Sequence, residues 1–474
     1  MANMETTLIN EYRFFDPDEK VRKIAYELYQ SVKNLPIVSP HGHVEPKMLA
    51  TNQPFPDPTE LIIIPDHYIY RMLYSQGIKL ESLGIPTVDG TQVEKDHRKI
   101  WQIFGDNFYL FAGTPTGIWL SHEFVEVFGI KERLNSQTAM RIYDQMQDKL
   151  NSKEFLPRTL FEKFNIEVLN TTDAASDNLE YHKNLKDSGW GGKVLPTFRP
   201  DGVVNITSKS WKKEIDSLSA SSNIDVNSYK NYIAALENRR AYFKNMGAVA
   251  TDQGIVSPYT HKLSVKDAEI IFQKALQGKA TNEDGYLFTA NMLMEMGRMS
   301  CEDGLVMQIH PGSMRNHNKK IYDRFGLDKG ADIPVQTEYT KNLYEFLNEF
   351  GNNKDLTVIL FTLDEATYSR ELAPLAGHYP ALKLGPPWWF HDSIEGMTRF
   401  RQRVTETAGI YNTVGFNDDT RAFLSIPARH DLSRRVDSNF LAGMVARHII
   451  DMDHALILGR ALAYDLVKRA YRLI

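Results

Sequence analysis

Eight times along the chain, a short apolar run is followed directly by polar or chemically reactive side chains. Apolar runs of this length that are bounded by glycine or proline are typical of buried parallel strands. The eight units are PIVSPHGH (36–43), IEVLNTTD (166–173), KVLPTFRPD (193–201), GAVATDQG (247–254), LVMQIHPG (305–312), LTVILFTLD (356–364), LKLGPPWW (382–389) and NTVGFNDDTR (412–421). Each reactive cluster therefore lies at the carboxyl end of a predicted strand.

Segments with helical periodicity separate most of these runs. Residues 177–189 begin with a capping residue and end in glycine, and residues 335–353 have a similar pattern. Strands that alternate with helices predict a parallel sheet. Eight such units would close a (β/α)8 barrel of the TIM type, an α/β fold with its catalytic groups at the carboxyl strand ends. A doubly wound open sheet is the alternative, but the sequence has no glycine-rich phosphate loop after its first predicted strand.

The interval from about residue 45 to 160 is too long for one strand-to-strand crossover. Its aromatic, helix-like content predicts a helical insertion between the first and second barrel strands, which covers the barrel mouth and lends residues to the site. No linker divides the chain, so we expect one domain over residues 1–474, ending in helices over about 430–474.

Composition excludes several classes of protein. The net charge of −5 is spread along the chain without a basic stripe, which argues against nucleic-acid binding. Cys301 is the single cysteine, so no intramolecular disulfide can form. The polar first twenty residues lack a signal-peptide core, and no apolar run reaches 18 residues. We therefore expect a cytoplasmic protein that does not enter the membrane.

Two short stretches hold candidate functional residues. His41 and His43 follow the first strand two residues apart, so in extended backbone both imidazoles point to one side and can bind one ion. A polar turn would explain such a pair equally well. Asp66, His67 and Tyr68 can be read either as a capped helix start or as catalytic residues.

An ordered set of motifs runs through nearly the whole chain. It comprises LPIVSPHGHVEP, PDHYIYRMLYSQGI, FAGTPTGIWLSHEF, FNIEVLNTTDAASDNLEYH, VLPTFRPDGVVNI, MQIHPGSMRNHN, GPPWWFHDSIEGM and NDDTRAFLSIPARHDLSRR. In this order the motifs resemble uronate isomerase (glucuronate isomerase), a divergent family of the amidohydrolase superfamily. The stretches PPWWF and DDTRAFLS are the most specific.

The resemblance implies an intramolecular oxidoreductase, an aldose–ketose isomerase for hexuronic acids. Such an enzyme interconverts D-glucuronate with D-fructuronate and D-galacturonate with D-tagaturonate. Moving the carbonyl from C1 to C2 requires a base for the C2 proton, a cation for the enediolate and a group that binds the carboxylate. The substrate is a small molecule, and we expect a homo-oligomer.

The family's metal ligands map to His41, His43 and Asp419. This donor set suits a divalent ion, zinc first, with manganese, iron or cobalt as alternatives. Asp419 is also the candidate base for the C2 proton. Asp418 is adjacent, and only the spacing to Arg421 favours Asp419 as the matching residue.

Other family positions map by the same motifs. His67 and Tyr68 would help open the sugar ring and move protons. Guanidinium groups bind carboxylates in bidentate fashion, and we expect one of the three candidate arginines to be only a structural salt bridge. The catalytic candidates are Asp419, His67, Tyr68 and Arg421, and the substrate-binding candidates are Arg199, Arg315, Asp252, His310, Trp388 and Trp389.

One position departs from the family pattern. Gln253 stands in TDQG where the family has a histidine, and neutral glutamine is neither acid nor base. Two outcomes stay open: the substitution changes the substrate or weakens the activity, or glutamine keeps the hydrogen bond that the histidine would make. Two other functions also stay open: a metal-dependent hydrolase of an amide, ester or lactone, and a sugar-acid binding protein without catalysis. Against the hydrolase, no lysine ends any of the eight runs.

Overall fold

The computed structural model describes residues 8–473; residues 1–7 and 474, the extreme ends of the predicted domain, lie outside it. It has an α/β fold whose main sheets are parallel. The strands of these sheets are β1 (Ile37–Ser39), β2 (Ile166–Asn170), β3 (Asp173–Ala174), β4 (Lys193–Leu195), β5 (Phe198–Arg199), β6 (Ala250–Ile255), β7 (Val306–Pro311), β10 (Val358–Leu360) and β11 (Leu382–Leu384). β8 (Ser313–Met314) and β9 (Ile333–Pro334) form a separate antiparallel pair.

The parallel strands lie side by side in chain order. One sheet has the order β1-β2-β4, and the other has the order β3-β5-β6-β7-β10-β11. β2 and β3 belong to one predicted run, as do β4 and β5, so the two sheets continue each other across short breaks. Beyond β11, Leu384 forms a parallel bridge with Thr413 of the eighth run. The backbone N–H of His43 donates to the carbonyl of Thr420 at 2.9 Å, so the first and eighth runs are in contact.

Apolar side chains from seven of the runs pack into one buried cluster, to which the seventh run contributes Trp388 and Trp389 and six others contribute aliphatic residues. The latter include Val38, Val168, Ala250, Val306, Ile359 and Val414, which Val467 and Tyr471 of the C-terminal segment join. Alternate residues of a strand point to one face, so this cluster marks the face that the strands share. Tyr471 donates its hydroxyl to Oε1 of Gln308 in β7 at 2.7 Å, which holds the chain end against that face.

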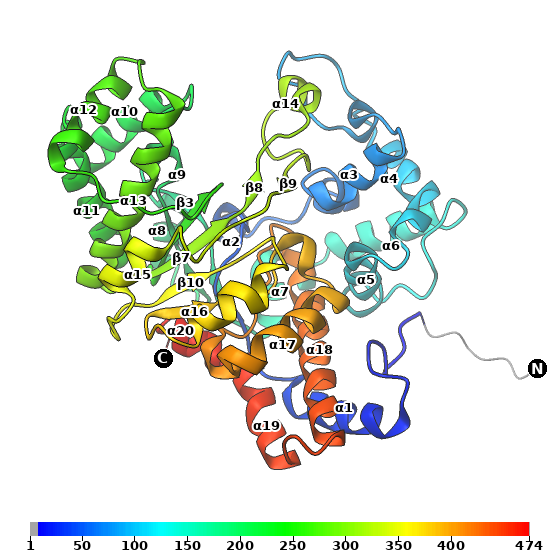
Figure 1. Ribbon diagram of the computed structural model, residues 1–474. Coiled ribbons are helices and arrows are strands. Elements are labelled where there is room, and N and C mark those ends of the chain that lie inside the picture. The colour runs from blue at the N-terminus through cyan, green and yellow to red at the C-terminus, as the bar shows by residue number, and fades with distance from the viewer. Residues whose placement is uncertain (1–7, 474) are drawn as a thin grey trace, which may run out of the picture.

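Helices form the rest of the fold, and between β1 and β2 the described elements are all helical. The α-helices are α1 (Glu19–Val32), α2 (Pro46–Thr51), α3 (His67–Ser75), α4 (His97–Asp106), α5 (Pro115–His122), α6 (Ala139–Leu150), α7 (Pro157–Lys163), α8 (Glu180–Asp187), α9 (Asp201–Val204), α10 (Trp211–Ser222), α11 (Tyr229–Asn245), α12 (Val265–Leu276), α13 (Asn282–Asp303), α14 (Lys319–Phe325), α15 (Tyr344–Phe350), α16 (Ala373–Ala376), α17 (Ile394–Ala408), α18 (Ile426–Ala446), α19 (Met452–Arg460) and α20 (Leu466–Ala470). In Figure 1, α10–α13 gather on one side of the strands and α3–α6 on the other. Within residues 8–473, no helix is long and apolar enough to span a membrane.

The two helices predicted from periodicity differ in outcome. The prediction for residues 177–189 is confirmed by α8. In 335–353, however, only α15 is helical, so the predicted length was wrong. The N–H groups of Thr337 and Tyr339 donate to the carboxylates of Asp364 and Glu371 instead of to a preceding helical turn.

Candidate active site

The side chains of His41, His43 and Asp419 converge where the first and eighth runs meet. Oδ1 of Asp419 lies 3.4 Å from Nε2 of His41 and 3.2 Å from Nε2 of His43. Among the described residues, this buried oxygen accepts no hydrogen bond. Ligand atoms about 2.1 Å from a tetrahedral zinc ion would lie about 3.4 Å apart. The three side chains are therefore spaced as they would be around one divalent ion.

Asp418 and Asp419 point in different directions because of an unusual backbone conformation. Asp419 has φ 38°, in the left-handed region that costs energy for a residue other than glycine. Strained backbone of this kind is concentrated at functional sites. Oδ2 of the buried Asp418 accepts a hydrogen bond from Nε2 of His430 at 3.0 Å. Asp418 therefore contacts His430, while Asp419 contacts His41 and His43.

The two histidines and the carboxylate shift one another's protonation. Burial would raise the pKa of Asp419, but the neighbouring imidazoles outweigh it and hold that pKa well below its usual range. Burial lowers the pKa of His43. Burial also acts to lower the pKa of His41, but the carboxylates of Asp252 and Asp419 outweigh it and raise that pKa. Asp419 is thus ionised at neutral pH, as a ligand or a base must be.

A second polar layer lies beneath this triad. His310 of β7 stacks on His41 with ring centroids 4.7 Å apart, and its Nδ1 lies 2.6 Å from Oδ1 of Asp252 in β6. Arg199 lies 3.3 Å from the other oxygen of Asp252. His41, Asp252 and His310 form a second set of possible ligands. Because Asp252 already pairs with two cationic or hydrogen-bonding groups, the triad with Asp419 is the better metal site.

The three candidate arginines all have carboxylate partners, but they differ in how firmly they are held. Arg199 donates its Nε to Asp201 at 2.7 Å in addition to its contact with Asp252. Within the described part of the chain, Arg315 has Asp332 as its one carboxylate partner, at 2.7 Å, and its side chain is 40% exposed. Arg421 is 3.6 Å from Asp328 and 35% exposed. The last two arginines can therefore turn to a ligand at lower cost.

His67 and Tyr68 begin helix α3, as the capped-helix reading predicts. Oδ1 of Asp66 accepts the backbone N–H of Tyr68 at 2.8 Å, which caps the helix. Both side chains line a small cavity of about 70 Å³ together with His43, Trp388 and Trp389. Burial and the nearby Arg421 lower the pKa of His67 to about 3, and burial raises the pKa of Tyr68 far above its usual value. Both side chains are therefore uncharged at neutral pH.

Arg429, which lines this cavity, belongs to a buried cluster that the sequence analysis does not predict. Arg429 of α18 lies 2.9 Å from Asp392 and stacks on Trp119 of α5, with 3.5 Å from its guanidinium carbon to the ring centroid. Burial raises the pKa of Asp392 to about 7, and Arg429 only partly offsets this. All three residues stand in motifs that are quoted above, but no spacing rule singles them out.

Gln253 occupies the position where the family has a histidine. It is buried in β6, and its Nε2 donates to the hydroxyl of Thr251 at 2.9 Å. Its Oε1 has no hydrogen-bond partner among residues 8–473. The side-chain amide is therefore held by the hydroxyl of Thr251 and keeps one hydrogen bond within its own strand.

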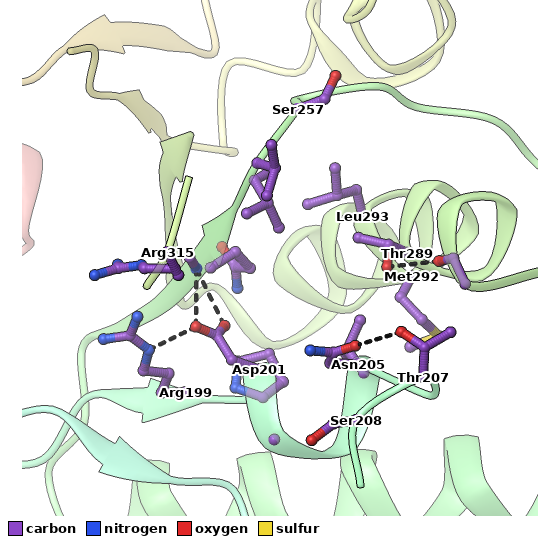
Figure 2. Close-up of a pocket in the computed structure, with 18 of the residues that line it drawn as sticks. Arg199, Asp201, Asn205, Thr207, Ser208, Ser257, Thr289, Met292, Leu293 and Arg315 are labelled. Atoms are coloured by element: carbon purple, nitrogen blue, oxygen red, sulfur yellow. Dashed lines mark hydrogen bonds and ion pairs between the residues drawn. The ribbon is translucent and has the colours of Figure 1, made fainter. Parts of the chain in front are cut away.

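A larger cavity of about 700 Å³ opens from the same point. His43 and Arg421 lie in its wall, as do Arg199 and Arg315. Figure 2 shows it passing the Arg199–Asp201 pair toward α13. All the predicted site residues therefore line one of these two cavities or, like His41, Asp252 and His310, lie buried against the triad.

Comparisons with known proteins agree over nearly the whole chain. The family model described as glucuronate isomerase matches residues 14–470. A uronate isomerase of Nostoc punctiforme is 56% identical, over 97% of this chain and 98% of its own. The crystal structure of a glucuronate isomerase from Caulobacter crescentus superposes with a TM-score of 0.97 at 51% identity, covering 98% of both chains. A uronate isomerase from Thermotoga maritima has a TM-score of 0.91 at 28% identity, covering 98% of this chain and 99% of its own.

Proposed function

Since the chain belongs to the glucuronate isomerase family, we propose that it interconverts the aldose and ketose forms of hexuronic acids. The reactions are D-glucuronate to D-fructuronate and D-galacturonate to D-tagaturonate. The observation that supports this best is the convergence of His41, His43 and Asp419 beside a cavity that the partly exposed Arg315 and Arg421 line. The reaction needs a cation, a base and a carboxylate-binding group, and the three kinds of residue lie together here.

His41, His43 and Asp419 fit a divalent metal ion. The fit rests on their spacing and on the buried Oδ1 of Asp419, which accepts no hydrogen bond from the described residues. When bound, such an ion would supply positive charge next to the sugar oxygens on which negative charge develops. Zinc is the first choice for two imidazoles and one carboxylate, with manganese, iron or cobalt as alternatives.

The protein's own residues divide the remaining work. Asp419, which is ionised at neutral pH, is placed at the triad to accept the C2 proton. His67, which is neutral, and Tyr68, which is protonated, open the sugar ring and pass protons at the cavity wall. Trp388 and Trp389 form the apolar wall that excludes water.

Arg315 and Arg421 bind the substrate carboxylate, since each has one carboxylate partner and a partly exposed side chain. Arg199 is the structural salt bridge expected among the three candidates. Asp201 and Asp252 occupy its guanidinium group, and Asp252 in turn contacts His310.

The proposal also includes the closure of the strands into a barrel and the place of the helical insertion. The chain order of the strands, the contact of the first and eighth runs and the shared inner cluster support a closed (β/α)8 barrel in one domain. The helical segment of about residues 45–160 then lies over the barrel mouth, where α3 contributes His67 and Tyr68. The enzyme works in the cytoplasm as a homo-oligomer.

Incubation with D-glucuronate and with D-galacturonate, followed by NMR, tests the proposal. We expect the two ketose products, and we expect D-glucose and D-galactose to remain nearly unchanged, because a neutral hexose lacks the carboxylate that Arg315 and Arg421 would bind. Equal turnover of glucose and glucuronate would contradict the assigned roles of the arginines. Absence of any ketose from either uronate would reject the function.

A further inference from the structure

The 700 Å³ cavity is larger than the proposed substrate requires. A hexuronate has about 13 non-hydrogen atoms, and even at the roughly 30 Å³ of a liquid water molecule for each atom it would fill about 400 Å³. The excess space runs away from His43 along α9 and α13. We call this part the distal arm; Asn205, Thr207, Ser257, Thr289 and Leu293 lie in its wall (Figure 2).

The lining of the distal arm differs chemically from that of the triad end. Within the described chain, the residues of 202–208 and 282–296 that line the cavity are all uncharged. They offer amide and hydroxyl groups, such as those of Asn205 and Ser208, beside the apolar side chains of Met292 and Leu293. Uncharged polar groups that alternate with apolar side chains suit a neutral organic ligand rather than an ion.

An aromatic pair lies at the same end. Tyr259 and Tyr286 both line the cavity, with ring centroids 4.9 Å apart and ring planes only 5° from parallel. Tyr286 is 49% exposed, so a ring edge and face remain available to a ligand. An aromatic ring packs well against the C–H face of a pyranose and leaves the sugar hydroxyls free to find polar partners.

We propose that the distal arm binds a second, neutral sugar ring, so that the enzyme also isomerises hexuronates that carry a glycosyl group. This inference rests on the proposed isomerase function. The glycosyl group is attached at O4, because every other position of the hexuronate is already in use. C1 and C2 react, O3 adjoins the reacting carbon, O5 closes the resting ring and the carboxylate pairs with arginine. The ligand class is a disaccharide with a uronate at its reducing end.

The chemical step is the same as for the monosaccharide. The C2–H bond breaks, a C1–H bond forms, the C1 carbonyl becomes an alcohol and the C2 alcohol becomes a carbonyl. One proton leaves C2 and one returns to C1, so no oxidant or reductant is needed. The glycosidic bond at O4 is neither made nor broken.

The test compares D-glucuronate with 4-O-β-D-glucopyranosyl-D-glucuronate on the same enzyme, with the ketose measured by NMR. We expect kcat/KM for the disaccharide within about tenfold of that for glucuronate. Thr289→Trp should fill the distal arm and lower kcat/KM for the disaccharide by at least about tenfold, with glucuronate changed by less than about twofold. Glu283→Trp, on an exposed position of the same helix, should affect neither sugar.

Tyr286→Ala gives an independent check, because it removes bulk rather than adding it. It should raise KM for the disaccharide and leave its kcat unchanged, since the second ring is bound but does not react. Turnover of glucuronate but not of the disaccharide would overturn the inference and leave the isomerase function intact. Equal slowing of both sugars by Thr289→Trp would also overturn it, because the distal arm would then be the entry route. If neither sugar reacts, the isomerase proposal fails and this inference fails with it.

Discussion

At the scale of single residues, the proposed metal site depends on three side chains, two near the start of the chain and one near its end. We predict that the double variant His41→Ala/His43→Ala contains no bound divalent ion, because one carboxylate alone is not a chelate. The wild type should contain close to one ion per chain by elemental analysis. His261→Ala/His454→Ala, at two exposed histidines, is the matched control and should keep its metal. Full metal content in the first variant would sink the ligand assignment.

The adjacent aspartates give the sharpest residue-level contrast. Asp419→Asn should lower uronate turnover by at least about 10²-fold, the usual contribution of a general base, and added zinc or manganese should not restore it. Asp418→Asn should do far less, because the amide oxygen of asparagine can still accept the hydrogen bond from His430. The measurement is turnover with and without added metal, with circular dichroism to check folding. A dead Asp418→Asn beside an active Asp419→Asn would reverse the two roles.

At the scale of elements, α17 and α18 are joined by a buried ion pair. Nε and Nη2 of Arg401 donate to the two carboxylate oxygens of Asp437 at 2.6 and 3.0 Å, and both residues are buried. Arg401→Met should lower the free energy of unfolding by about 3–5 kcal/mol, since it leaves Asp437 charged and unpaired.

Two further variants distinguish the effect of a buried ion pair on stability from the effect of an exposed one. Arg401→Met/Asp437→Leu should regain most of the lost stability, because no buried charge remains. Arg399 is in the same helix as Arg401 and pairs with Glu365, but its side chain is 39% exposed. Arg399→Met should therefore lower the free energy of unfolding by less than about 1 kcal/mol. Denaturant unfolding of the three variants measures these differences. Equal losses for Arg399→Met and Arg401→Met would show that burial is not the cause.

At the scale of the whole molecule, the chain end is anchored inside the fold. Tyr471→Phe removes the hydroxyl that donates to Gln308 and leaves a buried amide oxygen unpaired, which should cost about 1–3 kcal/mol of unfolding free energy. Tyr411→Phe, at a tyrosine that is 51% exposed, should change stability by less than about 0.5 kcal/mol. Identical melting curves for both variants would argue against anchoring by this bond.

The stability of the molecule should also depend on pH through a buried acid. Burial raises the pKa of Glu123 in η4 (Glu123–Val127) to about 8 from its usual 4.5. The folded state binds this proton more tightly than the unfolded state. The stability that protonated Glu123 contributes is therefore fully present below about pH 4.5 and is lost as the pH rises through 8.

Glu123→Gln removes this titration and should be more stable than the wild type at about pH 8.5, by up to roughly 4 kcal/mol, with little difference at about pH 4.5. Glu126→Gln, at an exposed position of η4, is the control and should match the wild type at both pH values. Denaturant unfolding at the two pH values measures this. A Glu123→Gln variant with the pH dependence of the wild type would refute the assignment.

Much of this protein can be predicted from local sequence. Seven of the eight apolar runs form strands, because periodicity and turn chemistry act over a few residues, whereas the eighth forms only a single bridge at Thr413. His41 and His43 are two residues apart on one run, so their convergence is local as well. The helix start at Asp66 follows from capping alone. The resemblance of the ordered motifs then leads to the family that the comparisons confirm.

What only the tertiary structure decided is which distant residues meet. The left-handed backbone at Asp419 selects it over Asp418, and the ion pairs show that Arg199 is held while Arg421 is loosely bound. The pairing of Arg429 with Asp392 and the uncharged distal arm also have no signature in sequence spacing. Such contacts depend on how strands and helices pack in space, and that packing balances burial and charge over the whole chain rather than within any one segment.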